Sequence, residues 1–280
     1  MTSVPGNDLH IEVVGDGPPL LLLHGWAMHG GVFAPLLPQL TLRFRVHLVD
    51  LPGHGRSRDS ALPLALEPVV DAIVARVPHA PWCGWSLGGL FALHAAATRP
   101  EAVDAVALLC ASPRFVREDS VQSDGWKYGM SAEIFRDFAT GLRDDYRGTL
   151  DRFIALEAFG SDDARGELRA LRSELFARGE PAAHALADGL ALLETADLRS
   201  VLPSLAMPSL WLAGRRDRLV DPRAMRIAAE LAPMSGFAQI EHGGHAPFLT
   251  HADEVAMHLA RFFGGHPRDG RDDGREQANP

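Results

Sequence analysis

The sequence predicts an α/β fold, a mainly parallel sheet covered by helices on both faces, with a helical insertion. Short apolar runs of strand length alternate with longer amphipathic or alanine-rich runs along most of the chain. This alternation is typical of strand–helix–strand units, whose strands pair in parallel. The middle of the chain differs, because residues 112–200 contain helix-like runs but no clear strand-like ones.

The expected strands are short apolar runs, several of which end at Gly, Pro or Asp, as buried strands that lead into loops do. In chain order they lie at residues 20–23, 46–49, 81–83, 105–110, 209–213 and 237–240. The helices that alternate with them are expected at residues 66–77, 87–98, 222–232 and 252–263. In sheets of this kind ligands bind beyond the carboxyl ends of the strands, so we expect the functional site there.

Four further helices are expected in the middle segment, at residues 132–141, 146–159, 162–178 and 181–194. We therefore divide the chain into a core, residues 1–111 and 201–264, and a helical cap, residues 112–200, which would act as a lid. Residues 265–280 are rich in Gly, Asp and Arg without apolar periodicity, and we expect them to form a disordered tail.

Composition narrows the possible functions. A net charge of −9 over 280 residues argues against general binding to nucleic acid or to an anionic membrane, since both need a basic footprint. The two cysteines, Cys83 and Cys110, lie in apolar runs and are expected to be buried thiols of a cytoplasmic protein. We find no leader, no apolar run of about 18 residues and no metal-ligand spacing, so we expect no membrane anchor, metal or cofactor. We also expect a monomer.

The segment Gly84-Trp85-Ser86-Leu87-Gly88 is the strongest functional signal. It joins an expected strand to an expected helix, and its serine would sit on a tight, strained turn with the hydroxyl exposed. The glycines on either side leave room for this turn, because a Cβ there would collide with neighbouring backbone. The segment predicts that Ser86 is a nucleophile.

A serine nucleophile needs a base and a group that orients the base. His245 follows Gly243-Gly244 in the loop between the last expected strand and the last helix, and we predict that it is the base. His242, in the same loop, is the alternative. Asp217 follows the strand at 209–213 and is predicted to orient the histidine; Asp221, the alternative, precedes Pro222 and is better explained as a helix N-cap.

The tetrahedral intermediate of acyl transfer needs hydrogen-bond donors for its oxyanion. The backbone N–H of Leu87, at the start of the helix after Ser86, is one expected donor. The backbone N–H of Trp26, in His24-Gly25-Trp26 after the first expected strand, is the other. The Trp26 ring could also line the pocket.

These residues, in the order Ser86, Asp217, His245, resemble the α/β-hydrolase superfamily over residues 10–263. Within it, the chain resembles the family of methyl ester esterases of biotin synthesis that act on pimeloyl-acyl carrier protein. The segments that carry this resemblance are His24-Gly25-Trp26, 84–90, Ala111-Ser112-Pro113, 152–156, 195–199 and 244–248.

The resemblance implies a serine esterase that hydrolyses the methyl ester of a pimeloyl chain carried by acyl carrier protein. The residues that it implies for the acyl channel are Trp26, Ser86, Leu87, Phe153, Ile154, Ala155, Leu156, Glu157 and His245. It also implies that Arg152, Arg165 and Arg169 of the cap contact the acidic carrier protein. The chain departs from the family pattern at Glu157, where an amide is frequent, and at Gly148, where a fourth arginine would fall.

Two other functions compete with this interpretation. A broad carboxylesterase for short acyl esters would use the same three residues without docking a carrier protein. A catalytically inactive receptor would use only the fold, but such proteins usually lose one of the three residues. The same three residues also support lactone and C–C bond hydrolysis, which the residues themselves do not distinguish.

Overall fold

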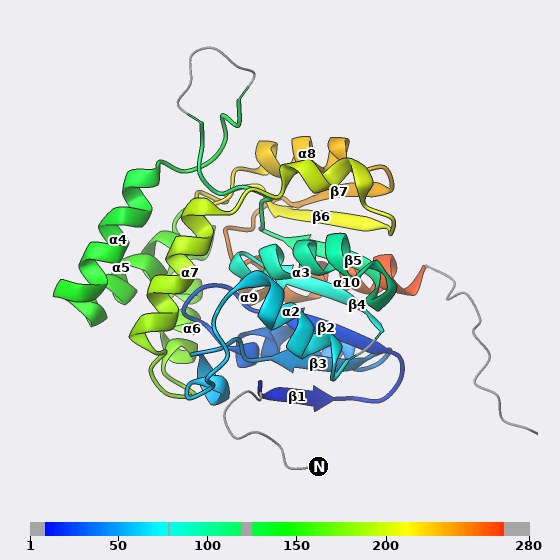
Figure 1. Cartoon of the computed structure of the whole chain (residues 1–280), viewed down its shortest axis with the longest axis horizontal. Coiled ribbons are helices and arrows are strands. Elements are labelled where there is room, and N and C mark those ends of the chain that lie inside the picture. Colours follow the sequence, from blue (N-terminus) through cyan, green and yellow to red (C-terminus); the bar gives the residue numbers. More distant parts are fainter. Residues whose placement is uncertain (1–8, 78, 119–124, 266–280) are drawn as a thin grey trace, which may run out of the picture.

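The computed structural model describes residues 9–77, 79–118 and 125–265, and it confirms the predicted fold class. Seven strands form one sheet in the order β1-β3-β2-β4-β5-β6-β7, and every neighbouring pair is parallel except β1 with β3 (Figure 1). The strands are β1 (Ile11–Val14), β2 (Pro19–Leu23), β3 (Arg45–Val49), β4 (Ala80–Trp85), β5 (Val103–Leu109), β6 (Ser209–Gly214) and β7 (Ser235–Ile240). All residues of β4 and β6 are buried, which requires helices on both faces of the sheet.

Four helices around the sheet lie close to the predicted ranges: α2 (Leu66–Val74), α3 (Leu87–Thr98), α8 (Pro222–Leu231) and α10 (Ala252–Gly264). Two shorter helices, α1 (Leu37–Leu40) and α9 (Pro247–Thr250), were not predicted. Short 3-10 turns, η1 (Gly30–Leu36), η2 (Gly55–Ser57), η3 (Pro100–Ala102) and η4 (Arg199–Ser204), complete the connections. Helix α3 packs against β4 and β5, and α8 packs against β6 and β7.

Strand β1 was not predicted from the sequence. It is only four residues long and forms the antiparallel edge of the sheet, where Ile11 pairs with Val49. Val13 is half exposed, so the strand has no buried apolar run of the kind that revealed the others. Short edge strands of this type give a weak sequence signal because few of their side chains are fully buried, and none is in β1.

Four helices separate β5 from β6 in the chain: α4 (Ala132–Asp144), α5 (Tyr146–Ala158), α6 (Ala164–Leu175) and α7 (Ala183–Thr195). We keep the name cap for residues 112–200, which include these four helices. Figure 1 shows them gathered at one end of the sheet, and hydrogen bonds join them to the loops there. The N–H of Ala182 donates to the carbonyl of Gly53, and the indole of Trp26 donates to the carbonyl of Leu186. The predicted tail lies, from residue 266 onward, outside the described residues.

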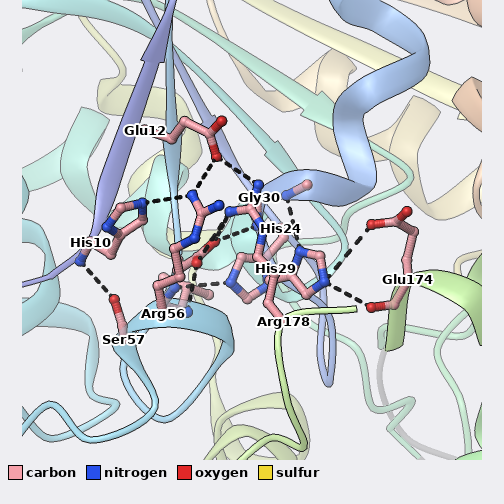
Figure 2. A network of polar contacts seen from close by, with 12 residues as sticks. His10, Glu12, His24, His29, Gly30, Arg56, Ser57, Glu174 and Arg178 are labelled. Atoms are coloured by element: carbon pink, nitrogen blue, oxygen red, sulfur yellow. Dashed lines mark hydrogen bonds and ion pairs between the residues drawn. The ribbon is translucent and has the colours of Figure 1, made fainter. Parts of the chain in front are cut away.

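A buried polar network ties the end of α6 to the core (Figure 2). Asp50, which follows β3 and is fully buried, accepts hydrogen bonds from the N–H groups of Gly30 and Arg56 at 2.7 and 2.9 Å. Arg178, just beyond α6, lies 3.3 Å from both Asp50 oxygens and donates to Glu12 of β1 at 2.6 Å. One guanidinium therefore links the cap to two strands of the sheet.

Two buried histidines in the same region are held in the neutral form. Burial, with His54 nearby, lowers the pKa of His24 to about 3, and burial lowers the pKa of His54 to about 4. Neutral His24 donates from Nδ1 to the carbonyl of Gly25 and accepts from the N–H of Leu51 at Nε2. This fixes the loop that carries Trp26 against the loop that follows β3.

Replacing Arg178 with Met is expected to lower the free energy of unfolding by about 2 kcal/mol, because Asp50 then stays buried with less compensating positive charge. Calorimetry should show a melting temperature roughly 4–8 °C lower. The matched control is Arg172→Met, which removes an exposed ion pair with Asp151 and should cost at most about 0.5 kcal/mol. Equal stability of the two variants would contradict a role for Arg178 in attaching the cap.

Candidate active site

Ser86 lies on a strained turn between β4 and α3. Its φ of 53° and ψ of −119° are outside the regions that residues with a Cβ usually adopt. The turn is possible because its neighbours lack side chains. A Cβ on Gly84 would stand 2.3 Å from the carbonyl oxygen of Gly88, and a Cβ on Gly88 would stand 2.3 Å from that of Leu23.

The structure brings Ser86, His245 and Asp217 together in a hydrogen-bonded row. His245 Nε2 lies 2.9 Å from Ser86 Oγ, and His245 Nδ1 lies 2.8 Å from Asp217 Oδ2. The carboxylate accepts only, so Nδ1 carries the proton and Nε2 is free to accept the hydroxyl proton of Ser86. All three residues are at least 95% buried. This is the geometry that a base-activated serine requires.

Backbone groups hold Asp217 in this position. Its second oxygen, Oδ1, accepts from the N–H groups of Leu219 and Val220 at 2.8 and 2.9 Å. The two alternatives from the sequence lie elsewhere. His242 is exposed and 3.9 Å from Asp162, and Asp221 caps the N-terminus of α8 by accepting from the N–H of Arg223.

The two expected oxyanion donors lie beside Ser86. Leu87 is the first residue of α3, so its N–H has no partner within the helix. Among the hydrogen bonds of the described residues, none has the N–H of Leu87 or Trp26 as its donor. Ala27, next to Trp26, has a φ of 65°, and a Cβ on Gly25 would stand 3.2 Å from the Cβ of Ser86. The loop that carries Trp26 thus passes close to Ser86, and the backbone N–H groups of Leu87 and Trp26 have no hydrogen-bond acceptor among the described residues.

An apolar pocket ends at Ser86 and His245. Helices α4, α5 and α7, the loop after β5 and the loop after β6 supply its other walls. These lining residues are Phe115, Met130, Ile134, Phe135, Phe138, Phe153, Leu190, Leu193 and Leu219. An apolar pocket with polar groups only at one end suits a substrate with an apolar chain and one reactive polar group.

Only part of the expected acyl channel lines this pocket. Phe153 does, and the Trp26 ring packs edge-on against it with centroids 4.5 Å apart. Ile154 and Glu157 are buried but do not line it, Leu156 is half-buried, and Ala155 is exposed. In an α-helix these successive residues point in different directions, so one helix cannot direct all of them into the same pocket.

The pocket residues of α4 and α7 were not predicted from the sequence. Phe138 follows Ile134 by four residues and Phe135 by three, and Leu193 follows Leu190 by three on α7, which is the spacing of a helix face. That spacing was available as a signal. It does not separate a face that packs on the core from a face that lines a pocket.

The three cap arginines expected to dock a carrier protein are exposed. Arg165 and Arg169 lie four residues apart on α6, and no ion pair within the described part of the chain involves either of them. Arg152 donates to Thr149 within α5. Other cap arginines are paired, Arg172 with Asp151 and Arg147 with Glu180. The cap therefore presents two unpaired positive charges on one helix.

Two buried carboxyl groups of the cap lie near the row of Ser86, His245 and Asp217. Glu157 on α5 and Glu167 on α6 are both fully buried. Burial, with Glu167 and then Asp217 nearby, raises the pKa of Glu157 well above its ordinary value. Burial also raises the pKa of Glu167 to about 7, although the N–H of Ala246 donates to it. The fold thus favours the neutral form of Glu157.

Comparisons with known proteins show the family to which the chain belongs. The family model described as alpha/beta hydrolase fold matches residues 18–252. The chain belongs to the α/β-hydrolase fold family. A curated protein of Xanthomonas campestris pv. campestris (strain B100), a pimeloyl-[acyl-carrier protein] methyl ester esterase, is 58% identical over 259 residues, which are 92% of this chain and 100% of that protein. A protein of the same name from Stenotrophomonas maltophilia (strain R551-3) is 56% identical and covers 94% of this chain and 99% of its own.

Solved structures of this family share the fold. An esterase from Exiguobacterium antarcticum superposes with a TM-score of 0.80 at 21% identity, covering 93% of this chain and 97% of its own. An enol-lactonase from Burkholderia xenovorans LB400 superposes with a TM-score of 0.79 at 21% identity, covering 94% and 99%. None of the helices in the described ranges is long and apolar enough to cross a membrane.

The raised pKa values predict how stability varies with pH. A carboxyl group whose pKa is raised by folding stabilises the protein fully below its ordinary pKa of about 4.5, and this contribution is lost as the pH rises through the raised value. Glu157→Gln replaces the neutral acid with a neutral amide of the same shape. We expect the variant to melt like the wild type near about pH 5 and several degrees higher at about pH 9. A melting difference that does not change with pH would contradict the assignment of a buried neutral acid.

Proposed function

We propose that the chain is a serine esterase that hydrolyses the methyl ester of pimeloyl-acyl carrier protein, releasing methanol and pimeloyl-acyl carrier protein for biotin synthesis. The observation that carries the proposal is the 55–58% identity to curated esterases of that name over nearly the whole chain. The hydrogen-bonded row of Ser86, His245 and Asp217 at the end of an apolar pocket supports it.

In the proposed reaction, Ser86 Oγ attacks the ester carbonyl while its proton moves to His245 Nε2. The negative charge that develops on the carbonyl oxygen is stabilised by the N–H groups of Leu87 and Trp26, each worth about 3 kcal/mol. Protonated His245 then gives its proton to the departing methoxide, which leaves as methanol. Asp217 holds the imidazole and stabilises its positive charge throughout.

The same groups then hydrolyse the acyl-enzyme, with a water molecule in the place of methanol. A water molecule gives a proton to His245 Nε2 as its oxygen attacks the acyl carbonyl, and the proton returns to Ser86 Oγ as the acid is released. The apolar pocket between α4, α5 and α7 accommodates the methylene chain during both steps. Phe153 and Leu193 are the wall residues from α5 and α7 that we expect the chain to contact.

A fluorophosphonate probe tests the nucleophile directly. We expect stoichiometric labelling of the wild type at Ser86, no labelling of Ser86→Ala, and a loss of esterase activity of at least about 1,000-fold in that variant. Mass spectrometry of the labelled peptide identifies the site. A folded wild-type protein that takes up no probe would contradict the serine mechanism and favour the receptor interpretation.

Arg165 and Arg169 are proposed to dock the acidic carrier protein. The double variant Arg165→Glu/Arg169→Glu is expected to lower kcat/KM for methyl pimeloyl-acyl carrier protein by roughly 10–100-fold, because it replaces attraction with repulsion. Hydrolysis of the small ester p-nitrophenyl butyrate should be unchanged. Steady-state kinetics on both substrates measures the difference.

The control has the same change in charge at the other end of the sheet. Arg43 and Arg45 are exposed at the start of β3, away from the carboxyl ends of the strands, so Arg43→Glu/Arg45→Glu should leave both reactions nearly unchanged. If the wild type cleaves the carrier-bound ester no better than small free esters, the broad carboxylesterase is the correct function.

A further inference from the structure

The peptide bond that joins His245 to Ala246 is held from two sides. Its carbonyl oxygen accepts a hydrogen bond from the indole Nε1 of Trp85 at 2.8 Å. Its N–H, on Ala246, donates to Oε1 of Glu167 at 3.1 Å. Trp85 belongs to β4 of the core, whereas Glu167 belongs to α6 of the cap. The backbone unit that carries the imidazole is thus clamped between core and cap.

The orientation of this peptide plane sets the position of the imidazole. Both nitrogens of His245 must stay within hydrogen-bonding distance of Ser86 and Asp217 at once. Displacements of about 0.5 Å or rotations of 10–20° are enough to impair such an arrangement. The cap also touches the preceding residue, because a Cβ on Gly244 would stand 3.1 Å from the Cβ of Ser161.

Stability alone does not explain a carboxyl group at this position. Glu167 is fully buried, and its second oxygen, Oε2, has no hydrogen bond of good geometry, although the Ser161 hydroxyl of the cap lies nearby. Glu157 on α5, Asp217 after β6 and His245 after β7 are the titratable groups that act on it. A buried carboxyl with one unsatisfied oxygen costs folding free energy, and an apolar side chain of the same size usually costs less.

We propose that Glu167 is a positioning residue for His245, which it holds from the cap through the N–H of Ala246 as Trp85 holds it from the core. The imidazole reaches its catalytic position only when α6 is docked on the loop after β7. The inference rests on the proposed triad and is independent of the carrier protein, since it concerns the attack by Ser86 on any ester.

Two isosteric variants separate positioning from structure. Glu167→Met keeps the volume but removes the acceptor, and we expect kcat for p-nitrophenyl butyrate to fall at least about 10-fold with KM within about 2-fold, while the melting temperature is unchanged or higher. Glu167→Gln keeps an acceptor for Ala246 and should retain at least about a third of the wild-type kcat. Glu133→Ala, an exposed cap position, is the control and should match the wild type.

The hydrogen bond from Trp85 of the core to the carbonyl of His245 provides a second test. Trp85→Phe removes the other hydrogen bond to the same peptide and should also lower kcat. Combined with Glu167→Met, it should cost less than the product of the two separate losses, because both act on one group. If Glu167→Met does not fold, Glu167→Ala takes its place in both comparisons, because it also removes the acceptor for the N–H of Ala246.

Three outcomes would overturn the inference: a folded Glu167→Met variant with kcat within about 2-fold of the wild type, a loss confined to KM, or equal losses in the Met and Gln variants. Labelling by the fluorophosphonate probe distinguishes the two proposals. A wild type that is not labelled at Ser86 refutes the serine mechanism itself. A labelled wild type with equally fast labelling of Glu167→Met refutes only the positioning role.

Discussion

The site depends on how closely polypeptide backbones approach one another at the carboxyl edge of the sheet. Gly88 leaves no room for a Cβ beside the carbonyl of Leu23, and Gly214 leaves none beside that of Gly244. These contacts bring the turn after β4 against the end of β2, and the histidine loop against the end of β6. Ser86 and His245 can form a hydrogen bond only because the loops that carry them are packed at this spacing.

Strain is concentrated at the same edge. The described residues other than glycine with positive φ are Ala27, Ser86 and Cys110, at the ends of β2, β4 and β5. Each of these backbone conformations is unfavourable by itself and is maintained by the packing around it. Buried strands on both sides make this edge rigid, so the free N–H groups and the serine hydroxyl keep their positions without a substrate.

The cap is attached unevenly. Helix α6 bonds to the histidine loop through Glu167, and Arg178, just beyond α6, bonds to Asp50. Helix α7 bonds to the loop after β2 through the carbonyl of Leu186. Helix α4 packs mainly on α5 and α7 and contributes three residues to the wall of the pocket. The cap is thus bonded through α6 and α7 to the loops that lie beside Ser86 and His245.

Six of the seven strands, the four longer helices beside the sheet, the four helices between β5 and β6, and the three residues that the structure brings together could be predicted from the sequence. These features are local: apolar runs, glycines around a serine, and a polar residue directly after a strand. The sequence did not reveal β1, which lies at an exposed edge. The family resemblance implied residues 153–157 for one acyl channel, and of these five the structure places Phe153 in the pocket wall.

Only the tertiary structure decided which apolar faces enclose the pocket and which carboxyl group reaches the histidine loop. Glu167 looks like any other acidic residue of a mixed-charge helix until α6 packs against the loop after β7. The physical reason is that burial, and the hydrogen bond that it makes necessary, are properties of elements far apart in the sequence. Periodicity along one helix does not contain that information.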